Sequence, residues 1–464
     1  MVMSDLQNIK ISRRSALVAL GSIVGGVLAR PRVGAAVPFV TPPRWLSEAH
    51  DVIRSVRQPS IPRRVVTLKP TDGDTRVLIQ QTIDDLARKG GGRVALSEGV
   101  WRSNGPLLLR SRIDLHISKD AKLVFSGDRG HYLPPVHTRW EGTELYGYSP
   151  CIYAYKAADV ALTGSGVLGV DRNGDMEDWR REQTEAQKRL RLMGASGVPL
   201  EQRVFAKGSF LRPSFVQFFG CERVLVEDIS IGTVPFWGVH LLYSDHCTVR
   251  GISVASDRVN NDGVDIDSSR RVVVERCRFN TGDDCVAIKS GRDQDGRSIG
   301  KPSEYIVVRD CQMNYSKSAG IAIGSEMSGG VRRVYLVRND MGRVDTALNI
   351  KANLDRGGFV QHVRVWNLAV KECESAVRIT TSYHGYMGGN FPPIFEDIEV
   401  DDLRCEQARQ AIIMRGDRQS LIRRVVLRDI SVVRSDRGSD FQHLQDVTCE
   451  RVVVVGESLQ QSCR

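Results

Sequence analysis

The sequence predicts an all-β protein whose chain winds into a parallel β-helix, and two observations carry this prediction. From residue 221 onward, an eight-residue pattern recurs in which apolar residues alternate with other residues around a central polar pair. Alternation with period two indicates strands that bury one face. The pattern returns every 23 to 35 residues, which is typical of one turn of a stacked solenoid.

Eight copies of the pattern mark the successive coils. They read "VLVEDISI" (224–231), "HCTVRGISV" (246–254), "VVVERCRF" (272–279), "IVVRDCQM" (306–313), "VYLVRNDM" (334–341), "VRVWNLAV" (363–370), "IEVDDLRC" (398–405) and "VVLRDISV" (425–432). The polar residue before the second apolar pair marks each copy, at Asp228, Gly251, Arg276, Asp310, Asn339, Asn367, Asp402 and Asp429. Leucine-rich repeats would need an Asn ladder, and a propeller would need about 40 residues per blade, so a parallel β-helix fits best.

The cysteines follow the same repeat. Cys277 and Cys311 occupy the position that Ile229, Leu368 and Ile430 occupy in other copies. A buried thiol behaves as a small hydrophobe. We therefore expect these two cysteines to stand in an inward-facing stack of core residues rather than to form disulfides.

The chain before residue 221 shows the same architecture with additions. Segments 113–127 and 160–170 alternate like further rungs, and residues 65–101 read as a strand, a turn and an amphipathic helix. The apolar residues of that helix are Val77, Ile79, Ile83, Leu86 and Ala87. An N-terminal capping helix would shield the open edge of the first coil.

Residues 172–205 interrupt the repeat with a charged segment of helical character. We expect it to be an insertion in a single β-helix domain that spans residues 37–464. It is a candidate for blocking one end of a groove along the β-helix.

The first 36 residues are predicted to be a signal peptide. Arg13 and Arg14 precede a mild apolar stretch over 16–29, and small residues follow at 34–36. Residues 12–17, "SRRSAL", resemble the twin-arginine export signal. The apolar stretch is shorter than the roughly 20 residues that span a bilayer, which disfavours a membrane anchor. We therefore expect a periplasmic or secreted protein.

The charge balance narrows the class of partner. Lys and Arg outnumber Asp and Glu by 65 to 55 in 464 residues, which gives a formal charge of +10. Such an excess suits nucleic acid, an anionic membrane surface or an acidic polymer. Nucleic acid is disfavoured because no basic block occurs beyond the N-terminus and only 6% of residues are aromatic.

Three aspartates form the candidate catalytic centre. Asp283 follows Asp262 by 21 residues, about one coil, and Asp284 lies beside it. On adjacent rungs these carboxylates would converge, and their repulsion would raise at least one pKa, as a general acid requires. The alternative is a ladder of turn-capping aspartates, which explains Asp262-Gly263 but not the Asp pair after Gly282.

These motifs resemble those of a known family. "NNDGVDIDS" (260–268) and "TGDDCVAIKSGRDQDGR" (281–297) are similar to the signatures of glycoside hydrolase family 28, the polygalacturonases and their relatives. "IGSEMSGGVRRV" (323–334) and "IKANLDRGG" (350–358) resemble stretches of its bacterial members. The similarity spans roughly residues 62–430 in the same order. It implies the right-handed parallel β-helix of pectin-lyase-like proteins.

The resemblance also implies roles for single residues. Asp283 would protonate the glycosidic oxygen, while Asp262 and Asp284 would activate water and give inversion. A rung of about 5 Å would by itself suggest a retaining enzyme, and here the family's inverting mechanism is preferred. The resemblance and the motif positions suggest five substrate-binding residues, which are Lys351, Arg356, Tyr383, Lys289 and Asn349. No cofactor or metal is expected.

Two departures from the family pattern bear on the substrate. The family's Gly-His-Gly should fall within residues 315–326, where Ser318 and Ala319 stand, and its Arg-Ile-Lys reads Asn349-Ile350-Lys351. In the family, that arginine and lysine hold a substrate carboxylate and the histidine supports the catalytic acid, so Arg356 is a candidate replacement.

The favoured function is an exported, monomeric hydrolase of acidic plant cell-wall polysaccharide (pectin), with no nucleic-acid or membrane partner. The alternatives are a rhamnogalacturonan-type hydrolase, a calcium-dependent pectate lyase on the same fold, and a non-catalytic carbohydrate-binding β-helix. The family motifs disfavour the lyase, and the aspartate cluster disfavours the pure binding module.

Overall fold

The computed structural model describes residues 42–459, except 175, 177–178, 385–387 and 456. The described residues belong to one compact unit, Thr41–Arg464. The predicted signal peptide lies outside the described residues. No helix in the described part of the chain is long and apolar enough to cross a membrane.

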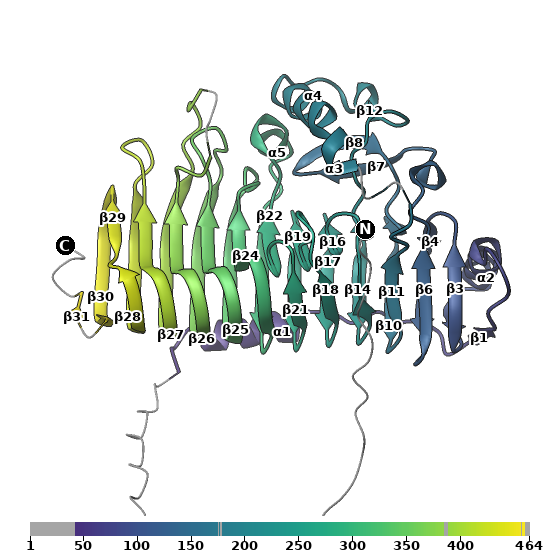
Figure 1. Cartoon of the computed structure of the whole chain (residues 1–464), viewed down its shortest axis with the longest axis horizontal. Helices are drawn as coiled ribbons and strands as arrows, with labels where there is room; N and C mark the ends of the chain where they lie inside the picture. The colour runs from purple at the N-terminus through teal and green to yellow at the C-terminus, as the bar shows by residue number, and fades with distance from the viewer. Residues whose placement is uncertain (1–41, 175, 177–178, 385–387, 456, 460–464) are drawn as a thin grey trace, which may run out of the picture. The chain divides into compact units, whose positions relative to one another are not determined.

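Parallel strands stack rung upon rung, as Figure 1 shows. The first sheet contains β1 (Val65–Leu68), β2 (Gly92–Leu96), β5 (Ile113–Ile117), β10 (Ala158–Gly164), β14 (Glu222–Glu227), β17 (Asp245–Arg250), β20 (Arg270–Glu275) and β23 (Ser303–Arg309). The second contains β3 (Gly99–Ser103), β6 (Ala121–Phe125), β11 (Val167–Val170), β15 (Ser230–Ile231), β18 (Ser253–Ser256) and β21 (Arg278–Thr281). The third contains β4 (Leu107–Leu109), β9 (Ile152–Tyr155), β13 (Val216–Phe219), β16 (Val239–Leu242), β19 (Val264–Asp267) and β22 (Val286–Lys289).

The later coils continue this stacking with longer strands that turn the corners between sheets. They are β24 (Gln312–Gly324), β25 (Val331–Lys351), β26 (Phe359–Thr380), β27 (Ile394–Arg415) and β28 (Ile422–Arg437), followed by β29 (Asp440–Gln442), β30 (Leu444–Val454) and β31 (Glu457–Ser458). Only β31 pairs antiparallel among them. The predicted strands and their coil-by-coil pairing are therefore confirmed.

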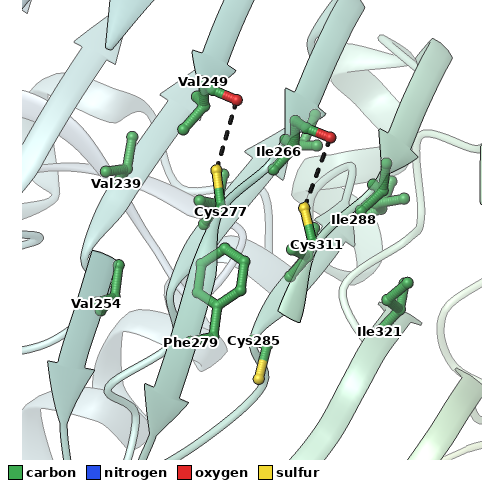
Figure 2. Packing of buried hydrophobic residues seen from close by; sticks show 14 of the residues in the cluster. Val239, Val249, Val254, Ile266, Cys277, Phe279, Cys285, Ile288, Cys311 and Ile321 are labelled. Carbon is green, nitrogen blue, oxygen red and sulfur yellow. Dashed lines mark hydrogen bonds between the residues drawn. The ribbon is translucent and has the colours of Figure 1, made fainter. Parts of the chain in front are cut away.

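The inward-facing residues of successive rungs form one continuous core (Figure 2). Cys277 and Cys311 are buried free thiols in this core, and the Cys277 Sγ lies 3.7 Å from the Val249 carbonyl oxygen. The expectation of a core role for these cysteines is confirmed. Cys449, by contrast, is disulfide-bonded.

The repeated marker position is a turn residue. At seven of the eight markers the backbone φ is positive, between 52° and 66°. Aspartate, asparagine and glycine tolerate this left-handed conformation best, which explains why they recur there. The remaining marker is Asn339, and its assignment is wrong by one position. The turn residue of that coil is Arg338, whose φ is 51°. Asn339 instead lies opposite Leu368 in the inward-facing stack.

Two helices pack on the β-helix before the insertion, and a short 3-10 helix follows them. α2 (Arg76–Arg88) buries Ile79, Ile83 and Leu86 over the first coil, as predicted, although Val77 is exposed. α1 (Leu46–Ser55), which the sequence did not reveal, packs with Trp45 against Val273, Val307 and Tyr335 on the outer face of the first sheet. η1 (Arg129–Tyr132) precedes the antiparallel pair β7 (Val136–Trp140) and β8 (Thr143–Gly147).

The interval predicted as an insertion is largely helical. It contains α3 (Trp179–Glu182), α4 (Thr184–Ala195), η3 (Leu200–Gln202) and β12 (Val204–Phe205), and β12 pairs with β8. Figure 1 shows α4 close to α5 (Asp293–Ile299), which follows β22. The insertion therefore stands over the rungs that carry the aspartates.

Asn339 supplies a test of the core. Its side chain accepts a hydrogen bond from the Cys311 amide (3.1 Å) and donates to the Val308 carbonyl oxygen (3.0 Å). We expect Asn339→Ala to lower the free energy of unfolding by about 1–3 kcal/mol for each group left buried and unpaired. Asn314→Ala, at an exposed position of β24, is the control and should have little effect in urea unfolding. Equal effects of both variants would contradict the assigned role of Asn339.

Candidate active site

The parallel register of β19 and β22 brings the three predicted aspartates together. Val264 pairs with Val286, so Asp262 and the Asp283-Asp284 pair enter the third sheet at neighbouring rungs. The Gly263 amide donates to the Asp284 carbonyl oxygen (3.0 Å), which fixes this alignment. Carboxylate oxygens of Asp262, Asp283 and Asp284 all lie within 4.8 Å of one another.

Asp284 is the carboxylate held in its ionised form. It accepts hydrogen bonds from the Ser318 hydroxyl (2.6 Å) and the Ala319 amide (2.9 Å), and the Lys351 Nζ lies 3.1 Å away. Burial alone would raise the pKa of Asp284, but Lys351, Lys289 and these hydrogen bonds lower it below its usual value. Ser318, in the segment where the family's Gly-His-Gly is expected, thus contacts the acidic cluster.

Asp283 has the opposite tendency. Burial and the neighbouring charge of Asp284 raise the pKa of Asp283. It is also the least buried of the three aspartates, and its carboxylate accepts hydrogen bonds from the Asn260 and Asp284 amides. Asp283 is therefore suited to keep a proton and to offer it to a bound molecule.

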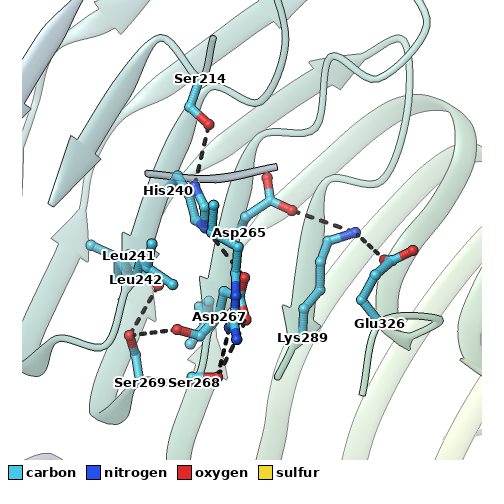
Figure 3. Close-up of polar contacts among 12 residues, drawn as sticks. Ser214, His240, Leu241, Leu242, Asp265, Asp267, Ser268, Ser269, Lys289 and Glu326 are labelled. Atoms are coloured by element: carbon cyan, nitrogen blue, oxygen red, sulfur yellow. Dashed lines mark hydrogen bonds and ion pairs between the residues drawn. The ribbon is translucent and has the colours of Figure 1, made fainter. Parts of the chain in front are cut away.

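A fourth carboxylate, Asp265, lies deeper in the wall. Lys289 Nζ lies 3.6 Å from Asp265 and 3.5 Å from Glu326 (Figure 3). It also lies 3.6 Å from Asp262. Burial and the neighbouring acids raise the pKa values of Asp262 and Asp265. Neither oxygen of Asp265 accepts a hydrogen bond, so this buried carboxylate depends on Lys289 for compensation. The signal for it was present in the alternating carboxylates of "DGVDID".

One cleft of about 680 Å³ contains the aspartates, within the range of small-molecule sites. Seven of the eight predicted site residues line it: Asp262, Asp283, Asp284, Lys289, Lys351, Arg356 and Tyr383. Asn349 does not. It is buried in β25, and its Oδ1 has no hydrogen-bond partner.

The cations of the cleft floor, which are Lys289, Arg292, Lys351 and Arg356, are already paired. Lys351 contacts Asp284 and lies 5.2 Å from the ring centroid of Tyr383. Arg356 donates to the Ser325 carbonyl oxygen (2.9 Å) and pairs with Asp293 (2.5 Å). Neutralisation by lysine and arginine is what allows so many carboxylates to be buried together.

A chain of ion pairs that sequence reasoning missed joins this floor to the insertion. Glu326 pairs with Arg292 (2.5 Å), whose Nε donates to the Glu141 carbonyl oxygen (3.0 Å). The Glu141 carboxylate in turn accepts from Gln187 (3.0 Å) and pairs with Arg191, both on α4. These residues come from segments far apart in the chain, and no local pattern marks them as neighbours.

A second buried ion pair anchors β7 beside the cleft. Arg139 donates to Asp267 (2.8 Å), and both side chains are fully buried. Burial alone would raise the pKa of Asp267, but Arg139 lowers it. His240, whose Nδ1 lies 2.8 Å from Gln217 Nε2, is held uncharged because burial lowers its pKa. This network fixes the β7–β8 turn, which carries Glu141, against the third sheet.

Comparison with known proteins agrees with the sequence motifs. Residues 205–452 match the family described as "Glycosyl hydrolases family 28". The crystal structure of a hyperthermoactive exopolygalacturonase from Thermotoga maritima is 36% identical, covers 89% of this chain and 97% of its own, and has a TM-score of 0.84. An endo-polygalacturonase from Pectobacterium carotovorum subsp. carotovorum is 25% identical over 382 residues, 78% of this chain and 85% of its own. A probable polygalacturonase from Vitis vinifera is 25% identical over 350 residues, 73% of this chain and 66% of its own. The expected all-β, right-handed parallel β-helix is confirmed.

The opposite pKa shifts of the aspartate pair predict opposite effects on stability. The folded state holds the Asp283 proton more tightly than the unfolded chain, so ionising Asp283 costs stability as pH rises through its folded pKa. Asp283→Asn should therefore raise the free energy of unfolding at pH 7 by about 0.5–2 kcal/mol. Asp284→Asn should lower it, because the ionised form that Lys351 stabilises is lost.

Urea unfolding at pH 7 and pH 4 measures both variants. The gain from Asp283→Asn should shrink at pH 4, where the wild-type carboxyl is protonated. Stability from Asp284 should persist until pH falls through its lowered pKa. Changes of the same sign in both variants would contradict the assigned protonation states.

Proposed function

The chain belongs to glycosyl hydrolases family 28, and from this premise we propose that it hydrolyses polygalacturonan from a chain end, with inversion at the anomeric carbon. The observation that carries this proposal is the cluster of three aspartates inside one cleft, where burial and Asp284 raise the pKa of Asp283 while Lys351 and Lys289 lower that of Asp284. A pure binding module has no use for adjacent carboxyl groups whose pKa values are shifted in opposite directions.

In the proposed reaction, Asp283 acts as general acid. Its proton moves to the glycosidic oxygen as the bond from that oxygen to the anomeric carbon breaks. Ionised Asp284, with Asp262, holds a water molecule and takes its proton as the water oxygen bonds to the anomeric carbon from the opposite side. Lys289 and Lys351 hold these carboxylates in place.

Inversion is proposed although the distance between the carboxyl groups, by the general rule for glycosidases, would suggest retention. Retaining glycosidases have carboxyl groups about 5–5.5 Å apart, and inverting ones leave a wider gap for water. The oxygens here lie within 4.8 Å. Inversion is nevertheless favoured because two of the three carboxylates can hold a water laterally, and none then has to act as the nucleophile.

The exo mode is proposed from the wall that α4 builds. Lys188, Arg191, Leu192 and Ala195 follow one another at helical spacing, and all line the cleft. A wall on one side of the catalytic residues leaves room for a chain end and obstructs a polymer that would run through. The similar Thermotoga maritima protein is described as an exopolygalacturonase.

Product analysis tests the reaction and its mode together. We expect wild-type protein to release short products of one size from polygalacturonan from the first minutes, without a ladder of intermediate oligomers. Rhamnogalacturonan is the alternative substrate, because the family's arginine is replaced by Asn349 and its histidine has no counterpart in the matching motif. If polygalacturonan is the substrate, rhamnogalacturonan should be cleaved more slowly. An early ladder would contradict exo action, and faster cleavage of rhamnogalacturonan would contradict the substrate.

The general acid has its own test. Asp283→Asn should reduce kcat by about 10²–10⁴-fold, because asparagine cannot give up a proton, while polymer binding survives. In the wild type, activity should fall as pH rises through the raised pKa of Asp283. A variant that keeps most of its turnover would move the acid to another residue.

We also propose that the chain is exported through the twin-arginine route. The support is the Arg13-Arg14 pair followed by a short apolar stretch. Replacing both arginines by lysine should hold the precursor in the cytoplasm, as measured by cell fractionation and immunoblotting. Unchanged export of this variant would contradict the proposed route.

A further inference from the structure

We propose that Lys188, on the cleft face of α4, binds a uronate carboxylate of the substrate, so that the insertion recognises an acidic sugar as well as forming a wall. This inference rests on the proposed function, because it names the contact that the same cleft makes with a galacturonan chain. It assigns a recognition role to a segment that interrupts the repeat.

α4 presents two different faces. Lys188, Arg191 and Leu192 line the cleft at spacings of three and four residues. On the other side, Ala186 and Leu190 are buried in a cluster of aromatic and aliphatic residues that includes Trp140 of β7 and Leu145 of β8. The apolar face therefore anchors the helix, and its orientation directs Lys188 toward the cleft.

The other cations of the cleft are committed to buried carboxylates. Lys289 is shared among Asp262, Asp265 and Glu326, and Lys351 pairs with Asp284. If either lysine turned to a substrate carboxylate, a buried acid would be left without compensation, which is strongly unfavourable.

The two arginines of the floor and the arginine of the insertion are committed as well. Arg292 pairs with Glu326, Arg356 with Asp293, and Arg191 with Glu141. Each of these pairs also joins separate segments of the fold. A substrate carboxylate that displaced one of them would loosen the cleft that binds it.

Six lysine and arginine side chains line the cleft in the described part of the chain, and Lys188 differs from the other five because its ion pair is exposed. Its side chain is 68% exposed, and its ion-pair partner, Glu185, is 83% exposed on the same helix. Exposed pairs of this kind contribute little to stability. Exchanging Glu185 for a sugar carboxylate therefore costs little, and the new pair forms in a cleft that shields it partly from solvent.

The experiment measures binding apart from catalysis. In the Asp283→Asn background, trigalacturonate is titrated by calorimetry against proteins with Lys188, Lys188→Gln or Lys188→Glu. We expect Lys188→Gln to raise Kd about three- to tenfold, and Lys188→Glu to raise it further. Lys371→Gln, at an exposed position of β26 outside the cleft lining, is the matched control and should leave Kd unchanged.

Two further readouts separate recognition of charge from a structural effect. The difference between Lys188 and Lys188→Gln should disappear with fully methyl-esterified trigalacturonate, which carries no charge, and should shrink at 0.5 M salt. With catalytically intact protein, Lys188→Gln should raise KM on trigalacturonate and leave kcat within about twofold.

The outcomes distinguish this inference from the proposed function. An unchanged Kd in Lys188→Gln, or an equal loss on the methyl ester, overturns the role of Lys188 even if polygalacturonan is hydrolysed. Absence of hydrolysis by the wild type, with a Kd that still depends on Lys188, overturns the proposed activity and supports the contact. Absence of any trigalacturonate binding overturns both.

Discussion

The parallel register between neighbouring rungs is the constraint on which the structure depends. It stacks like residues on like residues in the core, so that cysteines, leucines and isoleucines of successive coils meet without any local signal between them. It also places turn residues of the left-handed conformation above one another. The same register brings Asp262 to the Asp283-Asp284 pair, across 21 residues of chain, so the chemistry follows from the fold's repeat.

Stacking acids in this way has an electrostatic cost that two lysines offset. Lys289 ends β22 and Lys351 ends β25, which β24 separates in the third sheet, and between them these lysines contact Asp262, Asp265, Asp284 and Glu326. The two lysines contact the aspartate pair unequally, and this separates the pKa values of Asp283 and Asp284. Lys351 forms an ion pair with Asp284, which also accepts two hydrogen bonds, whereas neither lysine is in direct contact with Asp283. Two adjacent carboxyl groups thus have pKa values that are shifted in opposite directions.

The insertion is coupled to this floor by buried charge rather than by apolar packing alone. Glu326, Arg292 and Glu141 connect Lys289 to α4, and Arg203 near the end of the insertion pairs with Asp295 of α5 (2.5 Å). Removing one member would leave its partner buried and uncompensated. The wall of the cleft and the aspartate cluster therefore keep a defined relation to each other, which the proposed action on a chain end requires.

The sequence by itself determined the β-helix, the capping helix and the aspartate cluster, because each is written in a local or periodic pattern. Period-two alternation tells which face of a strand is buried, and a period of one coil tells which residues can meet. It did not reveal that Asn349 is buried away from the cleft, that Asn339 belongs to the core stack, or that Glu141 and Arg292 reach the site. Only the tertiary structure decided these, because coils differ in length and the loops between rungs bring their charged side chains together through long-range ion pairs. Such pairs depend on three-dimensional position, and no spacing along the chain encodes it.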